Sequence, residues 1–147
     1  MTRGSSAHVS MRPLPSTTPV TCLRHDRVIT EQVIQAAISV HSALGPGLLE
    51  SAYQTCLAYE LRERGQAVET QVPLDLVYKG VVLDAGYRLD LVVEGSVIVE
   101  LKAVRQLHPI HEAQLLSYLK LSGIKVGLLM NFHVPLLRDG IRRIVYG

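Results

Sequence analysis

Residues 90–102 read Asp-Leu-Val-Val-Glu-Gly-Ser-Val-Ile-Val-Glu-Leu-Lys, two apolar runs joined by the turn-forming pair Glu94-Gly95. Short apolar runs separated by a glycine-containing turn are typical of a β-hairpin. Asp90 lies just before the first run, and Glu100 and Lys102 close the second. Charged side chains in apolar strands cost several kcal/mol unless they are paired, hydrogen-bonded or bound to a metal. This cluster of charges is therefore the strongest indication of function in the chain.

Two hairpin registers are open for Asp90, and they place its side chain on opposite faces of the hairpin. A two-residue turn at Glu94-Gly95 pairs Asp90 with Val99 and points the aspartate away from Glu100. A three-residue loop over 94–96, with its glycine in the left-handed conformation, or an equivalent bulge, pairs Asp90 with Glu100 instead. Only the second register brings the two carboxylates together.

In that second register the two carboxylates stand about 5 Å apart at Cβ and repel each other unless a cation lies between them. Such oxygen ligands suit a hard divalent ion such as Mg²⁺. Lys102 leaves the same strand face as Glu100, because the two residues are two apart in sequence. Lys102 can then stabilise charge on a phosphate or help to deprotonate an attacking water. An ordinary ion pair between Lys102 and either acid is the alternative, and Glu-x-Lys alone does not exclude it.

Three helices follow from apolar periodicity. One covers about residues 30–43 with Thr30 as its N-cap, and a second runs from Leu48 to Gly65, where a glycine is expected after a helix. A third begins at His108-Pro109, since proline is tolerated in a first turn, and ends at Ser122-Gly123. We therefore expect two helices before the hairpin region and one after it.

Strands fill much of the rest. Between positions 67 and 102 the apolar period is two or the runs are short, with further turn-forming pairs at Lys79-Gly80 and Ala85-Gly86, which indicates three or four strands. Two more strands are expected at 125–131 and 141–146. With four strands in the hairpin region, the predicted order is α-α-β-β-β-β-α-β-β. The unbroken apolar run within 125–131 suits a strand covered on both faces, so an α/β fold with a mixed sheet flanked by helices is predicted.

Composition limits the class of protein. A chain of 147 residues, 48% of them hydrophobic, can build one packed domain, which we place at residues 26–147. Residues 1–25 mix Ser, Thr, Pro and basic residues without periodicity and are predicted to be a disordered extension. The net charge of +2 does not identify a polyanionic partner, and Cys22 and Cys56 lie too far apart to indicate a metal knuckle. No apolar run approaches the ~20 residues of a membrane span, so a cytoplasmic protein without a membrane partner is expected.

Polar residues in two of the predicted helices extend the cluster. His111, Gln114 and Tyr118 fall at i, i+3 and i+7 and share one side of the third helix, although such a stripe is also typical of an ordinary helix flank. Glu50 lies in the first turn of the second helix, where the helix dipole favours an acid with or without a metal. Arg88 shares a strand face with Asp90, so we expect it to pair with that acid or to contact phosphate.

Three segments taken together resemble the GxxExxY family of the PD-(D/E)XK nuclease superfamily. The resemblance covers about residues 30–146, and the residue before Asp90 is Leu89 where many of these nucleases have proline. The segments are Gly47-Leu48-Leu49-Glu50-Ser51-Ala52-Tyr53, Asp90 with Glu100-Leu101-Lys102, and Gln114-Leu115-Leu116-Ser117-Tyr118.

The resemblance implies a restriction-endonuclease-like core and a metal-dependent nuclease. Glu50, Asp90 and Glu100 would bind one or two Mg²⁺ or Mn²⁺ ions. The implied catalytic set is Glu50, Asp90, Glu100, Lys102, Gln114 and Tyr118. The expected partner is nucleic acid, DNA rather than RNA, and a homo-oligomer is expected because small nucleases often need two copies to grip a duplex.

Two other functions stay open on the sequence. The first is a nuclease-like fold that serves as a non-catalytic nucleic-acid-binding or self-assembling protein. The second is an unrelated enzyme that uses His108 or His111 as a base.

Overall fold

The computed structural model describes residues 20–147, with side chains from residue 25 onward. Three helices and a five-stranded sheet make up this part of the chain. In chain order they are α1 (Val20–Leu44), α2 (Glu50–Glu63), β1 (Val68–Tyr78), β2 (Val81–Val93), β3 (Val97–Lys102), α3 (Pro109–Ser122), β4 (Val126–Asn131), the short 3₁₀ helix η3 (Leu137–Gly140) and β5 (Ile141–Val145). No helix in this part of the chain is both long enough and apolar enough to cross a membrane.

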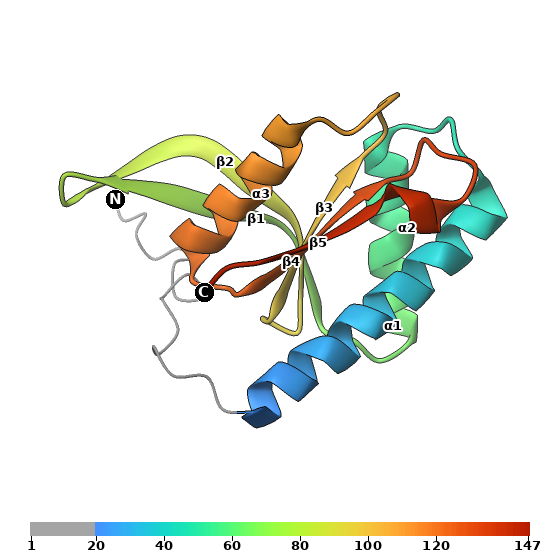
Figure 1. Ribbon diagram of the computed structural model, residues 1–147, viewed down its shortest axis with the longest axis horizontal. Helices are drawn as coiled ribbons and strands as arrows, with labels where there is room; N and C mark the ends of the chain where they lie inside the picture. Colours follow the sequence, from blue (N-terminus) through green and yellow to red (C-terminus); the bar gives the residue numbers. More distant parts are fainter. Residues whose placement is uncertain (1–19) are drawn as a thin grey trace.

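The sheet has the spatial order β1-β2-β3-β4-β5, and α3 covers one face while α1 and α2 cover the other (Figure 1). The β3–β4 pair is parallel, because α3 connects the two strands as a crossover, and the other pairs are antiparallel. The predicted α/β class, a mixed sheet flanked by helices, is therefore confirmed.

The core consists of two apolar layers separated by the sheet. Val99 and Leu101 of β3 pack against α1 and α2, whereas Ile98 packs toward α3, as the alternation of a strand requires. Gly127 of β4 allows α3 to approach closely, because a Cβ atom there would lie 2.9 Å from Leu115. These two layers fix β3, the strand that ends in Glu100 and Lys102, from both sides.

The hairpin region contains three strands, so the predicted fourth strand is wrong. The Ala85-Gly86 pair does not end a strand. It lies in a bulge of β2, where the pairing with β1 shifts between Leu74 and Leu76. Gly86 has a φ of 77°, and its N–H donates to Asp84 Oδ1 at 2.9 Å, which stabilises the bulge. A turn-forming pair thus produces an irregular strand here instead of a hairpin turn.

The first helix begins at Val20 and not near Thr30. Thr30 is inside the helix, because its hydroxyl donates to the carbonyl of Asp26 one turn earlier and does not cap the helix end. Residues 20–25, which we had placed in the extension, therefore lie in α1, and residues 1–19 lie outside the described residues. The other two helices begin and end within two residues of the predicted positions.

Candidate active site

The β2–β3 hairpin has the register that brings its two acids together. Its loop is the three residues 94–96, closed by a 3.0 Å hydrogen bond from Ser96 N–H to Val93 C=O. Leu91 pairs with Val99, so the next position along the hairpin places Asp90 opposite Glu100. The loop backbone is left-handed at position 94 (φ 54°) as well as at the glycine (φ 63°). Of the two registers that the sequence leaves open, the structure therefore has the three-residue one.

Asp90 and Glu100 lie where the two strands separate. Glu100 Oε2 accepts a hydrogen bond of 2.9 Å from the backbone N–H of Asp90. Asp90 Oδ2 accepts one of 2.9 Å from the backbone N–H of Leu101. The two carboxylates thus accept hydrogen bonds from backbone N–H groups that a carbonyl of the neighbouring strand would otherwise accept. These bonds fix both side chains relative to β2 and β3.

The electrostatics of this carboxylate pair, Asp90 and Glu100, disfavour two negative charges. Glu100 is only 5% exposed, and burial together with the charge of Asp90 raises its pKa to about 8. Burial also raises the pKa of Asp90, against the lowering effects of its hydrogen bond from Leu101 and of Lys102. In the metal-free protein the pair therefore retains a proton near neutral pH.

Glu50 approaches the carboxylate pair from α2, of which it is the first residue. Its Oε2 accepts a long hydrogen bond, 3.4 Å, from the backbone N–H of Ala103, just beyond β3. Its charge contributes to the raised pKa of Asp90, so the two acids interact electrostatically. The first turn of α2 therefore lies next to the C-terminal end of β3, at the opposite end of the hairpin from its loop.

Tyr53 holds the loop that precedes Glu50. Its hydroxyl donates to the carbonyl of Gly45 and accepts a 3.1 Å hydrogen bond from the backbone N–H of Leu48. The ring is completely buried and stacks on Phe132, with 4.4 Å between ring centroids. The tyrosine of the Gly47-to-Tyr53 segment thus has a structural role in placing its glutamate.

Lys102 ends β3 on the same side as Glu100, and its positive charge lowers the pKa of both carboxyl groups of the pair. Among the described residues it forms no ion pair, so the predicted alternative of an ordinary salt bridge is not what the structure has. Its backbone is fixed, because Phe132 N–H donates to the Lys102 carbonyl at 2.8 Å and the buried Asn131 side chain bonds both backbone groups of Val104. The ammonium group is therefore available to a ligand.

Within the described residues, no group of three or more His, Cys, Asp or Glu side chains is arranged as a metal site. The three predicted metal ligands thus do not form a ready three-carboxylate cage. The carboxylate pair alone nevertheless suits a hard divalent cation, because Mg²⁺ is commonly held by one or two carboxylates with water completing its shell. A cation would also relieve the repulsion that raises the pKa of Glu100. The donor set of this site fits such an ion.

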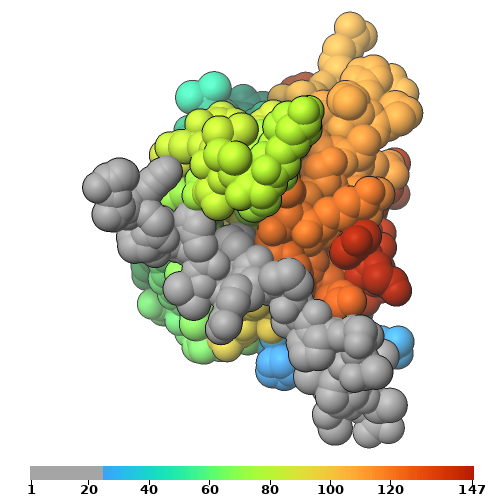
Figure 2. Space-filling model, turned by 90° about the vertical axis from the view of Figure 1, so that its left-hand side faces the viewer, coloured from blue at the N-terminus to red at the C-terminus, as the bar shows by residue number. Residues whose placement is uncertain are grey.

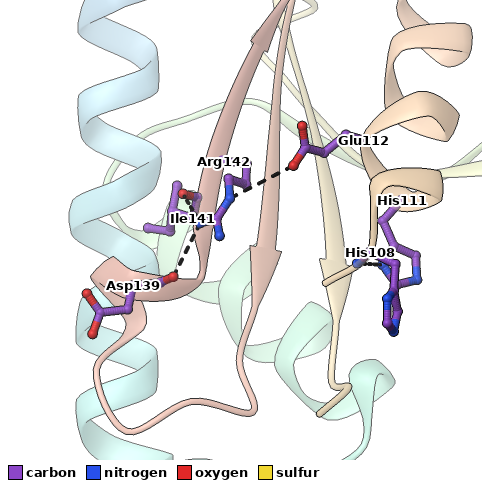
Figure 3. Close-up of polar contacts among 6 residues, drawn as sticks. All are labelled: His108, His111, Glu112, Asp139, Ile141 and Arg142. Atoms are coloured by element: carbon purple, nitrogen blue, oxygen red, sulfur yellow. Dashed lines mark hydrogen bonds and ion pairs between the residues drawn. The ribbon is translucent and has the colours of Figure 1, made fainter. Parts of the chain in front are cut away.

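His111 lies at the start of α3, near Lys102 and Glu50 in electrostatic terms. Its Nδ1 accepts a 3.0 Å hydrogen bond from the backbone N–H of His108 at the helix N-cap (Figure 3). Burial and the charge of Lys102 lower its pKa, so the neutral ring carries its proton on Nε2. With Nδ1 occupied, His111 is placed to donate a hydrogen bond and not to act as a base.

Tyr118 lies within electrostatic range of the carboxylate pair. Burial and the negative charges of Glu100 and Asp90 raise the pKa of Tyr118 to about 12. Gln114 lines the same cavity as Tyr118, but among the described residues no hydrogen bond joins it to the carboxylates. The structure therefore places Tyr118 beside the site and Gln114 in the cavity next to it.

Gln71 of β1 is a site residue that could not be selected from the sequence. It lies across from Asp90, and its Nε2 donates to Asp90 Oδ1 at 3.5 Å and to Gln54 Oε1 of α2 at 2.7 Å. Its φ of 52° is unusual for a residue other than glycine and marks local backbone strain beside the site. The pairing of a polar strand residue with Asp90 appears only once the β1–β2 register is known.

Among the described residues Arg88 forms no ion pair with Asp90, so the first of its two expected roles is wrong, and the contact with phosphate stays a prediction. Its Nη1 donates to the carbonyl of Tyr87 on its own strand at 3.2 Å. The basic group is exposed and directed along β2, away from an ion pair with the aspartate. Glu112 and Arg142 form a separate weak pair, 3.9 Å apart, between α3 and β5 (Figure 3).

Comparison with known proteins identifies the family of the chain. Residues 27–144 match the sequence profile of the PD-(D/E)XK nuclease superfamily. Neither the curated proteins nor the solved structures compared with the chain include a match. The matched range spans most of the 147 residues and contains the carboxylate pair, Glu50 and Lys102. The chain therefore belongs to the PD-(D/E)XK nuclease superfamily, which indicates a nuclease-type function.

Proposed function

We propose that this protein is a divalent-metal-dependent nuclease of the GxxExxY family that hydrolyses phosphodiester bonds, with DNA preferred over RNA. The observation that carries the proposal is the carboxylate pair on two paired strands. Glu100 is buried and accepts from the backbone N–H of Asp90, whereas the half-buried Asp90 accepts from the backbone N–H of Leu101, and neither acid forms an ion pair within residues 25–147. Such an arrangement is costly for folding alone, which supports a role in binding a cation. Nucleases of this superfamily generally use divalent metal ions and act on nucleic acid.

Asp90 and Glu100 would hold the Mg²⁺ or Mn²⁺ ion, with Glu50 as a further ligand from the start of α2. When bound, such an ion lowers the pKa of water and neutralises charge on a phosphate. Lys102, which forms no ion pair within residues 25–147, would bind the non-bridging oxygens of the phosphate and stabilise the charge that develops there. These assignments give each of the four charged residues a distinct task.

The residues of α3 would orient the substrate. The Tyr118 hydroxyl stays protonated at neutral pH, because its pKa is raised to about 12, and so it can donate a hydrogen bond to phosphate. His111 can donate from Nε2 in the same way. Gln114, one turn before Tyr118, would hold the nucleotide next to the reacting phosphate from within the cavity.

Site-directed variants test the proposal. Glu100→Gln and Lys102→Met should each abolish Mg²⁺-dependent cleavage of a labelled DNA substrate while the circular dichroism spectrum is unchanged. Glu112→Gln is the matched control, since this acid lies on α3 at the surface and pairs only weakly with Arg142. We expect the control to cleave at the wild-type rate.

If the wild-type protein cleaves neither DNA nor RNA with Mg²⁺ or Mn²⁺, the alternative of a non-catalytic nucleic-acid-binding or self-assembling protein replaces the proposal.

That the protein forms a homo-oligomer stays a prediction. The tip of the β1–β2 hairpin exposes five large apolar side chains, which are those of Val77, Tyr78, Val81, Val82 and Leu83. Replacing them by charged residues and measuring the sedimentation coefficient tests whether copies of the chain associate through this tip.

A further inference from the structure

A groove lies between α3 and the part of the β1–β2 hairpin that projects beyond the sheet. Figure 2 shows the yellow-green surface of the hairpin next to the orange surface of α3. The groove volume is about 560 Å³, within the roughly 300–1,000 Å³ typical of ligand sites. It follows α3 from Ile110 to Leu121, which at 1.5 Å per residue is about 16 Å. Its lining includes Leu76, Tyr87, Ile110, Gln114, Tyr118 and Lys120.

Tyr118 connects the groove to the carboxylate pair. It lines the groove, and its hydroxyl is within electrostatic reach of both Glu100 and Asp90. Its ring meets that of Tyr87 edge-on, with 5.8 Å between centroids and 61° between planes. Tyr87 is 41% exposed, so part of its ring is open to a ligand. Tyr118 therefore belongs to the groove and lies near the carboxylate pair, and Tyr87 offers an aromatic surface beyond it.

We propose that this groove binds an unpaired nucleobase of the substrate, next to the phosphodiester bond that is cut; the inference rests on the proposed nuclease function. A base is a flat apolar ring with a polar edge. Tyr87 provides the stacking surface, and Gln114 and Ser117 provide side-chain donors and acceptors for the edge. Lys120 lies toward the C-terminal end of the groove, where the next phosphate of the strand would pass.

The same features favour single strands over duplexes. In a duplex both faces of each base are covered by neighbouring bases, so a stacking site requires an unpaired or displaced base. Aromatic side chains on which any base can stack, next to basic side chains that contact phosphate, are typical of sites that bind single-stranded nucleic acid. The protein should therefore prefer single-stranded regions, frayed ends or flaps to an intact duplex.

Binding in the absence of cleavage tests the inference. Fluorescence anisotropy would compare a labelled single-stranded oligonucleotide with the same sequence as a duplex, in buffer with EDTA. Tyr87→Ala should raise the Kd for the single strand about tenfold, since stacking on one aromatic ring contributes about 1–3 kcal/mol per base. Tyr87→Phe keeps the ring and should bind as the wild type does. Tyr59→Ala, which removes an exposed tyrosine of α2 on the other face of the sheet, is the matched control.

Ile110→Glu is a second variant that does not touch the packing of Tyr87 against Tyr118. Ile110 is 69% exposed at the edge of the groove, so the substitution should leave folding intact while placing a charge in the path of the base. It should weaken single-strand binding at least as much as Tyr87→Ala. Leu136→Glu carries the same charge change at an exposed position outside the groove and should have no such effect.

Three results would overturn the inference: Tyr87→Ala binding the single strand as tightly as the wild type, an equal loss for single strand and duplex, or a change of sedimentation coefficient that identifies the groove as an interface between copies. Because the assay contains no metal, these results are independent of cleavage. If the protein cleaves with Mg²⁺ but Tyr87→Ala leaves the Kd for the single strand unchanged, only the base site is disproved. If Tyr87→Ala weakens binding of the single strand but the wild-type protein cleaves no nucleic acid, only the proposed nuclease function is disproved.

Discussion

Glu100 illustrates how a single buried acid can make stability depend on pH. Its pKa is raised from 4.5 to about 8, chiefly by burial and then by the charge of Asp90. Between these two pH values the folded state keeps a proton that the unfolded state releases. The free energy of unfolding of the metal-free protein should therefore fall as pH rises through this window and level off above it.

Glu100→Gln removes this pH dependence. The variant should gain stability relative to the wild type as pH rises from about 5 to about 9, on the order of a few kcal/mol at about 1.4 kcal/mol per pKa unit. At the acid end both side chains are neutral, so little difference is expected there. Urea unfolding in EDTA at both ends of the window measures the effect. An equal difference at the two pH values would show that Glu100 titrates normally.

Gln71 tests whether the positive φ beside Asp90 stores strain. In a regular strand Ala is more stable than Gly, but at φ 52° the order should reverse. Gln71→Gly should therefore be more stable than Gln71→Ala by about 1 kcal/mol, since both lose the same side-chain hydrogen bonds and differ only in the backbone. Urea midpoints of the two variants give the comparison. A more stable Ala variant would mean that the backbone at this position is unstrained.

Charged site residues could be selected from the sequence by their cost in apolar strands, whereas Gln71 and Gln54 could not. Asp90, Glu100 and Lys102 are costly in apolar strands, and that cost predicted a shared site. Gln71 and Gln54 carry no such cost, so only the three-dimensional pairing of β1, β2 and α2 reveals their bond network. The expected ion pair of Arg88 failed because a shared strand face does not determine where a long flexible side chain points.

The start of α2 depends on one hydroxyl. Tyr53→Phe removes the group that joins Gly45 C=O to Leu48 N–H, and should cost about 1–3 kcal/mol of unfolding free energy. Because Glu50 follows this loop, the variant should also lower kcat of Mg²⁺-dependent cleavage about tenfold. Thermal unfolding and cleavage kinetics measure the two effects.

Tyr59→Phe is the control on the same helix, because this tyrosine is 65% exposed. It should match the wild type in both assays. If Tyr53→Phe also matches the wild type, the hydroxyl does not position Glu50, and the tyrosine serves only as a packing residue.

At the level of elements, periodicity and helix-stop residues predicted α2, α3 and β4 closely, because their boundaries are set by local turn and cap chemistry. Strand number and register were harder. The sequence Ala85-Gly86 suits a bulge as well as a turn, and only the long pairing of β1 with β2 decides between them. The hairpin at Glu94 left two registers open, because loop length depends on whether position 94 itself accepts a left-handed backbone.

The whole molecule brings together segments from both faces of the sheet. The hairpin supplies two acids and a lysine, α2 arrives from the α1–α2 layer with Glu50, and α3 arrives from the opposite layer with Tyr118 (Figure 1). The sequence predicted the class of the fold and, through the family resemblance, placed all five of these groups in one candidate site. Among the described residues Gln114 forms no hydrogen bond with the acids, which depends on how α3 packs on the sheet and could not be predicted from spacing along the helix.

A bound cation should stabilise this assembly as a unit. At a Mg²⁺ concentration one hundred times its Kd, stabilisation is about 2.7 kcal/mol, which corresponds to a Tm increase of roughly 5–10 °C for a domain of this size. The increase should be larger at about pH 8.5 than at pH 6, because the cation competes with the proton on Glu100. Differential scanning calorimetry measures it. In Glu100→Gln the increase should be absent, and an undiminished increase there would place the ion elsewhere.

The most direct measurement is a crystal structure of the protein with Mn²⁺, in which anomalous scattering locates the ion. We expect an anomalous peak bounded by the carboxylates of Asp90 and Glu100, with Lys102 on the same side of β3. A peak at another position, or none in crystals of a protein whose cleavage activity requires Mn²⁺, would contradict the proposal that these two acids form the metal centre.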